Sequence, residues 1–90
     1  MNQPDAPKIE FPCQNYPIKV VGVMMENYEQ VIVDIVRVHA EDCDIERIRV
    51  QDSSNGRFRS VTLYITATGK EQLVNIHRDL SAHPNVRMVI

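Results

Sequence analysis

The stretch Ser53–Thr68, SSNGRFRSVTLYITAT, constrains the fold of this chain more than any other. From residue 58 onward, apolar side chains alternate with polar or aromatic ones. Because successive side chains of a β-strand point to opposite faces, this pattern predicts a regular strand with one face on a core. The inward positions are Val61, Leu63, Ile65 and Ala67, and the outward ones are Phe58, Ser60, Thr62, Tyr64 and Thr66.

The dipeptide Asn55-Gly56 before this strand predicts a hairpin, because both residues tolerate the positive φ angles of a two-residue turn. Arg47–Gln51 is then expected to pair antiparallel with Phe58–Thr62, leaving Asp52–Arg57 at the tip. The second strand as a whole is predicted over Ile45–Gln51.

An earlier strand is predicted over Tyr16–Met24, where a nearly continuous apolar run is typical of a central strand. Gly22 within it indicates a bulge or the close approach of another backbone. A first helix is expected from Asn27 to about Ala40, with Gln30 completing a capping box. Its predicted apolar face comprises Tyr28, Val31, Ile32, Ile35, Val36 and His39.

A second helix is predicted after Thr68, with Glu71 completing another capping box and Pro84 marking the stop. Its predicted stripe is Leu73, Ile76, His77 and Leu80. A short last strand is expected over Val86–Ile90.

The resulting order, β-α-β-β-α-β, predicts an α+β, ferredoxin-like fold, with a four-stranded antiparallel sheet and two helices on one face. We expect the first and third strands to be central and parallel neighbours, with the second and fourth at the edges. Residues 13–90 are predicted to form one domain after a flexible leader over residues 1–12.

Composition narrows the function classes. With a net charge of −2, the chain lacks the positive excess that nucleic-acid binders usually carry. The sequence shows no secretory signal, has only two cysteines, and has no apolar run long enough to span a membrane. It therefore predicts a cytoplasmic protein.

No motif predicts catalysis, a metal or a cofactor. The possible metal ligands Cys13, His39, Cys43, His77 and His83 lack the paired spacing of zinc sites. No base is placed beside the hydroxyls of Ser53, Ser54 or Ser60, or beside the Cys13 thiol. We therefore expect no catalytic residue and no metal site.

Three surfaces remain as candidate binding sites, the third being the loop between the first strand and the first helix. The first is the hairpin tip, where hydroxyls, backbone N–H groups and one cation are suited to an anionic ligand; the alternative is a solvated turn. Its residues are Ser53, Ser54, Asn55, Gly56 and Arg57.

The second candidate is the sheet face away from the helices, with Arg47, Arg49, Phe58 and Tyr64, and with Arg59, Lys19 and Arg87 nearby. Aromatic residues beside arginine are common in protein interfaces, so one interpretation is a homodimer or a protein partner that covers this face or the short apolar edge strand Val86–Ile90. RNA-recognition domains share this element order and stack bases on such a face. Their third-strand pattern is met at Phe58 but not at Arg57 or Ser60.

Several motifs together resemble the YbeD-like family of small bacterial proteins. They are Glu10-Phe11-Pro12, Tyr16–Gly22, Ser53–Gly56 with Ser60-Val61, Ala67-Thr68 with Glu71-Gln72, and Val86–Ile90. The resemblance implies a fold similar to the ACT domains, which bind small regulatory ligands and are often dimeric. It also implies a loose association with lipoate metabolism in some members, with no assigned reaction.

ACT domains often place an Asp and a Gly between the first strand and the first helix to hold an amino acid. This chain has Val23-Met24-Met25-Glu26-Asn27 there, so the resemblance extends to the fold and not to that site. The combined prediction is a non-catalytic regulatory or interaction module that binds a small ligand or a protein. The alternative is an RNA-binding module that uses the exposed sheet face.

Overall fold

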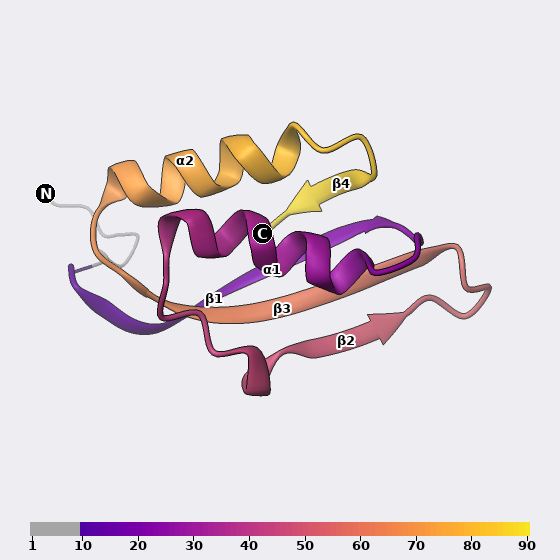
Figure 1. Ribbon diagram of the computed structural model, residues 1–90, viewed down its shortest axis with the longest axis horizontal. Helices are drawn as coiled ribbons and strands as arrows, with labels where there is room; N and C mark the ends of the chain where they lie inside the picture. Colours follow the sequence, from indigo (N-terminus) through magenta and orange to yellow (C-terminus); the bar gives the residue numbers. More distant parts are fainter. Residues whose placement is uncertain (1–9) are drawn as a thin grey trace, which may run out of the picture.

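The computed structural model describes residues 10–90 as one sheet with two helices (Figure 1). The predicted leader falls largely on residues 1–9, which lie outside the described residues. The elements in order are β1 (Cys13–Val23), α1 (Tyr28–His39), the short 3-10 helix η1 (Ile45–Arg47), β2 (Arg49–Asp52), β3 (Phe58–Ala67), α2 (Lys70–Ser81) and β4 (Val86–Val89).

The sheet has the strand order β2-β3-β1-β4, so β1 and β3 are central and β2 and β4 are the edges, as predicted. β1 and β3 run antiparallel, and the expectation that they would be parallel neighbours is wrong. Each β-α-β crossover links two parallel strands that are separated by a third, and the strand between them runs opposite to both. The ferredoxin-like arrangement is confirmed.

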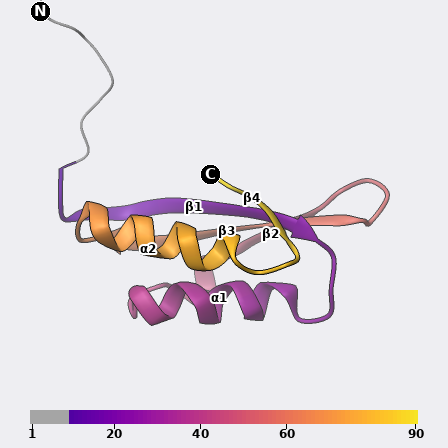
Figure 2. The ribbon, with the colours of Figure 1, turned by 90° about the horizontal axis from the view of Figure 1, so that it is seen from above.

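Both helices cover the same side of the sheet, and within residues 10–90 no element covers the other side (Figure 2). The core lies between these two layers. The alternation predicted for β3 is confirmed, because its inward side chains are all buried. The largest fully buried side chains are Tyr28, Ile32, Leu63, Ile65, Ile76 and Leu80.

The first helix face was predicted largely correctly, although Val33 is also buried and the predicted Val31 and Ile35 are only partly so. On α2, His77 is exposed, which contradicts its place in the predicted apolar stripe. It lies on the flank of the helix that faces the end of β4 rather than the core.

The second strand is shorter than predicted and begins only at Arg49. Before it, the Asp44 carboxylate accepts a hydrogen bond from the Glu46 N–H at 2.9 Å, which favours a local turn, η1, over extended backbone. The antiparallel pairing with β3 is confirmed, but its predicted register is wrong: Arg49, not Arg47, lies opposite Thr62, and Asp52, expected at the tip, pairs with Arg59.

The hairpin is confirmed, but its turn is longer than two residues. The Ser53 N–H donates to the Phe58 carbonyl at 2.9 Å, and the Gly56 N–H donates to the Ser53 carbonyl at 2.9 Å. Of the Asn-Gly pair, only Gly56 has a positive φ, 73°. A type I′ turn would need two such residues, so the chain closes through a wider loop.

Neither predicted capping box forms. Asn27 is the N-cap of α1 but adopts a left-handed backbone without a side-chain cap, and Gln30 donates to Asp34 instead. α2 begins one residue later than expected, with Gly69 as its N-cap in place of Thr68.

The prediction for Gly22 is confirmed in both respects. The β1–β4 register shifts between Val21 and Gly22, which marks an irregularity there. A Cβ at Gly22 would lie 2.4 Å from the Asn85 carbonyl oxygen and 2.4 Å from the Tyr28 hydroxyl. Only glycine lets β1, α1 and the loop before β4 come this close.

Candidate functional site

The uncovered side of the sheet, here called the open face, is the broadest candidate binding surface. The strand registers place side chains from all four strands on it, and Lys19, Thr62 and Arg49 lie in one row across β1, β3 and β2. The residues of the open face are Pro17, Lys19, Val21, Val23, Arg49, Gln51, Phe58, Ser60, Thr62, Tyr64 and Met88.

The open face is cationic although the chain as a whole has a net charge of −2. Lys19 and Arg49 are exposed, and within residues 10–90 neither makes an ion pair. None of the open-face positions carries a carboxylate. A shallow groove of about 460 Å³ runs between the two cations, with Ser60 and Thr62 in its floor. A second groove of about 310 Å³ continues it toward Phe58, and its lining includes Asp52, whose carboxylate is paired with Arg59.

Aromatic side chains mark the two ends of the open face. At one end the Arg47 guanidinium lies 4.3 Å from the centre of the Tyr64 ring and donates to the Asn15 side chain at 2.6 Å. At the other end Phe58 is 39% exposed. Tyr64 lies six residue steps along the strand from Phe58, roughly 20 Å at about 3.3 Å per step, so one nucleotide step does not reach both rings.

The predicted open-face residues are therefore only partly brought together. Arg49, Phe58 and Tyr64 lie on the open face as expected, and Arg47 reaches its end from η1. Arg59, expected near them, is instead on the helix side of β3.

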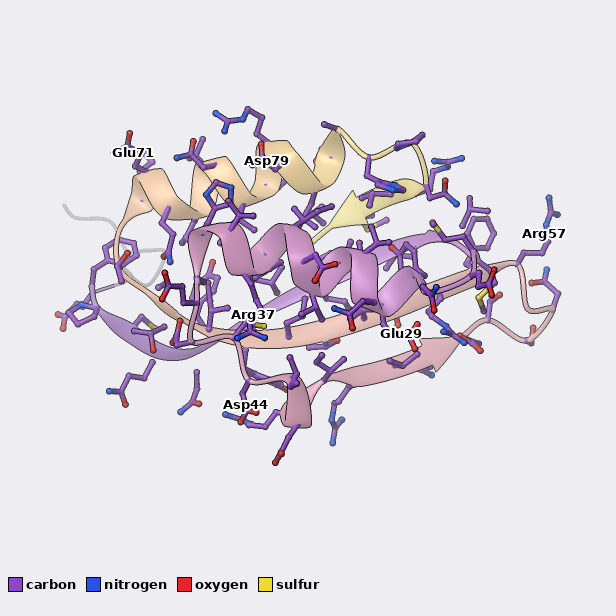
Figure 3. All side chains as sticks on the ribbon, in the orientation of Figure 1. Glu29, Arg37, Asp44, Arg57, Glu71 and Asp79 are labelled. Carbon is purple, nitrogen blue, oxygen red and sulfur yellow. The ribbon has the colours of Figure 1, made fainter. Side chains whose placement is uncertain are left out.

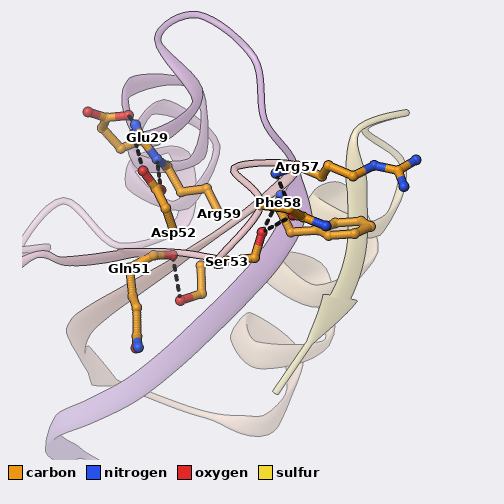
Figure 4. A network of polar contacts seen from close by, with 9 residues as sticks. Glu29, Gln51, Asp52, Ser53, Arg57, Phe58 and Arg59 are labelled. Carbon is orange, nitrogen blue, oxygen red and sulfur yellow. Dashed lines mark hydrogen bonds and ion pairs between the residues drawn. The ribbon is translucent and has the colours of Figure 1, made fainter.

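There Arg59 joins three elements (Figure 4). Its guanidinium donates to Asp52 of β2 at 2.6 Å and to Glu29 of α1 at 2.7 Å, and its side chain is 21% exposed. These hydrogen bonds lower the pKa of the Asp52 carboxyl and raise the pKa of Arg59. Since Glu29 is 30 residues away in sequence, no local pattern predicts this cluster. It holds the end of β2, and hence Gln51 and Arg49, against the rest of the fold.

The hairpin tip uses its polar groups to shape its own turn. The Asn55 side-chain oxygen accepts from the Ser53 hydroxyl at 2.9 Å and from the Arg57 N–H at 3.0 Å. The Ser53 hydroxyl in turn accepts from the Phe58 N–H at 3.1 Å (Figure 4). The Arg57 side chain extends away from the molecule (Figure 3). Ser54 and Gly56 are exposed in the same loop, so the predicted anion site stays a prediction.

Reactive side chains outside these surfaces have structural surroundings. The His39 ring bonds the Asp79 carboxylate at 2.6 Å across the two helices, and this bond lowers the pKa of Asp79. Burial raises the pKa of the Cys43 thiol, which makes it a poor nucleophile. Within residues 10–90 no three His, Cys, Asp or Glu side chains gather as a metal site would require. In that same range no helix has the length and apolar character to cross a membrane.

Known structures share this architecture. Protein HP0495 from H. pylori aligns with a TM-score of 0.70 at 14% identity, covering 100% of this chain and 97% of that chain. The ACT domain from GTP pyrophosphokinase of Chlorobium tepidum aligns with a TM-score of 0.63 at 18% identity, covering 82% of this chain and 91% of that chain. The fold is therefore ACT-like, as the sequence resemblance implies.

Sequence comparison identifies the family directly. A UPF0250 protein of Azotobacter vinelandii is 53% identical over 85 residues, which is 94% of this chain and 92% of the relative. The model of the family described as "Protein of unknown function (DUF493)" matches residues 6–90. The chain thus belongs to the DUF493 family, whose UPF0250 proteins are the YbeD-like proteins of bacteria that its sequence motifs resemble.

Proposed function

We propose that this protein is a non-enzymatic interaction module that binds an acidic segment of a partner protein across the open face. One observation carries the proposal: Lys19 and Arg49, which make no ion pair within residues 10–90, flank a groove whose described lining residues include no carboxylate side chain, in a chain that is net acidic overall. Complementary charge gives such surfaces their specificity and steers association.

Apolar contact area lies beside the charges. Phe58 and Met88 are 39% and 54% exposed, and Val21 is half-buried between them on β1. Protein interfaces combine apolar and aromatic side chains with arginine in this way. An acidic segment with interspersed apolar residues therefore fits the open face better than a purely charged polymer does.

Nucleic acid is the competing anion. The roughly 20 Å between Phe58 and Tyr64 at strand spacing argues against stacked bases on this face, since stacking on neighbouring aromatics is how such sheets bind RNA. Arg47 also covers the Tyr64 ring. These features favour a protein partner.

The test compares the same charge reversal at two exposed arginines that lie on different surfaces of the molecule. Arg49→Glu alters the open face, and Arg37→Glu makes the same change on α1, where Arg37 is also exposed. Each variant and the wild type are used as bait in nuclease-treated extract of the source cell, and retained proteins are identified by mass spectrometry.

We expect a protein that wild type and Arg37→Glu retain and that Arg49→Glu loses, with retention falling as salt rises. A partner lost equally in both variants, or retained by both, overturns the proposal. A signal that disappears on nuclease treatment supports the nucleic-acid alternative instead.

A further inference from the structure

A second surface of different chemistry lies on the helix side, between α2 and the β1–β4 edge. It is an apolar cleft of about 280 Å³, just below the range of about 300–1,000 Å³ typical of small-molecule sites. Its floor is formed by the buried Ile18 and Ile76, and its walls by Tyr16, Leu73, Val74, Val89 and Ile90. Lys70 and His77 complete its lining.

The cleft arises from unequal strand lengths. β1 spans 11 residues and β4 only four. The last backbone hydrogen bonds on this edge join Lys19 and Ile90. The Lys19 N–H donates to the Ile90 carbonyl at 3.1 Å, and the Ile90 N–H donates to the Lys19 carbonyl at 2.8 Å. Beyond that point β1 continues with no neighbouring strand among residues 10–90 on this edge, while α2 continues above it (Figure 1). The stripe 70, 73, 74 and 77 of α2 therefore faces a gap and not a strand.

An added strand is a poor occupant of this gap. Backbone N–H groups alternate between the two edges of a strand, and the Lys19 N–H points toward the β4 edge. Pro17, two residues earlier, therefore has its nitrogen on that same edge of β1. Proline has no N–H to donate to an added strand. Next to it, the β1–β3 register shifts between Cys13 and Tyr16, where Asn15 has a φ of 56°. A proline and a bulge are the devices that keep edge strands from pairing.

The polar groups at the rim define the ligand instead. Lys70 is exposed, and within residues 10–90 it makes no ion pair. Among the described residues that line the cleft, none has a carboxylate side chain. We propose that the cleft binds a small amphipathic carboxylate, with its apolar body against Ile18, Leu73 and Val74 and its anionic group beside Lys70.

This site is independent of the open face, because it lies on the opposite side of the sheet. The test uses the full chain, labelled with ¹⁵N, and straight-chain carboxylates from hexanoate to decanoate below their micelle concentrations. Amide shifts report both the position of binding and the dissociation constant. Octylamine and octanol serve as probes with the opposite charge and with no charge.

We expect saturable shifts confined to the residues around the cleft, with affinity rising up to about fourfold per added methylene until the cleft is filled. Lys70→Gln should weaken octanoate binding about two- to fivefold, as expected for one exposed charge. The matched variant Lys19→Gln, which removes a lysine from the open face, should leave it unchanged. Val74→Glu, at a position that is 54% exposed and tolerant of a polar side chain, should abolish it.

Three results would overturn the proposal: shifts that centre on another surface, equal binding of octanoate and octylamine, or equal effects of the two lysine variants. A dispersed spectrum of Lys70→Gln shows that its weaker octanoate binding does not come from unfolding. Because Lys70 is exposed in the first turn of α2, we expect the fold to be retained.

Discussion

Substitution of Gly22 by alanine tests the packing that joins β1, α1 and the loop before β4. In open space this change would stabilise the protein by about 0.4–1 kcal/mol, because alanine restricts the unfolded chain. At Gly22 the new Cβ would instead lie 2.4 Å from a backbone oxygen of Asn85 and 2.4 Å from the hydroxyl of the fully buried Tyr28. Neither a backbone group nor a buried ring moves freely, and overpacking of this kind costs about 1–3 kcal/mol.

Within the described residues, the Tyr28 hydroxyl is buried and has no hydrogen-bond partner. Leaving such a group unsatisfied costs roughly 1–3 kcal/mol, so Tyr28→Phe should leave stability unchanged or raise it. It also removes one of the two contacts that oppose alanine at Gly22. In Gly22→Ala/Tyr28→Phe we therefore expect part of the loss to be recovered, while the contact with Asn85 remains.

Urea unfolding followed by circular dichroism measures all four proteins of this cycle. We expect Gly22→Ala to lower the free energy of unfolding by about 1–2 kcal/mol net of the gain in the unfolded state. An alanine variant as stable as wild type would show that a Cβ fits at this position. Likewise, a Tyr28→Phe variant less stable by about 1 kcal/mol or more would show that the hydroxyl has a partner, and either result would contradict this packing.

Three further predictions concern stability. Gly69→Ser should raise the free energy of unfolding by a few tenths of a kcal/mol, since the N-cap of α2 has no side-chain acceptor and its backbone is extended; an unchanged urea midpoint would count against a capping role. Arg59→Gln should destabilise the protein more than Arg57→Gln does, because only Arg59 bridges three elements; equal urea midpoints would contradict this. Three folded-state carboxyl pKa values lie below the ordinary 3.8, so the unfolded state binds more protons and stability should fall as pH drops below about 4. These three carboxyl groups belong to Asp42, Asp52 and Asp79. If the urea midpoint is measured at decreasing pH, Asp79→Asn should lose less stability in acid than wild type does. An unchanged dependence of the midpoint on pH would contradict the lowered pKa of Asp79.

Much of the fold follows from local patterns. The alternation in β3 predicts its two faces, and the element order predicts the layers, because periodicity and crossover handedness are properties of short segments. The wrong prediction of parallel β1 and β3 came from treating neighbours in the sheet as partners in a crossover. The start of β2 was misplaced because one Asp44 hydrogen bond outweighs a weak alternation.

The candidate sites were harder to predict from the sequence than the fold was. Arg59 occupies an inward position of the alternating pattern, and this position could have indicated that its side chain lies on the helix side of the sheet. No sequence pattern indicated that Glu29 would be its partner. The cleft beside α2 depends on the lengths of β1 and β4, and segment ends are what sequence patterns define least well. Its residues Leu73 and Val89 appear in sequence only as ordinary apolar positions.

The most direct test of the open face is site-specific photocrosslinking in the source cell. Thr62 lies between Lys19 and Arg49 in the row across the open face, and Val38 on α1 is 76% exposed and serves as the control position. A photoreactive amino acid at Thr62 should crosslink to an acidic segment of a protein, and the adduct should disappear in Arg49→Glu, while the probe at Val38 gives no such adduct. Adducts with RNA at Thr62, or the same protein adducts from both positions, would contradict the account.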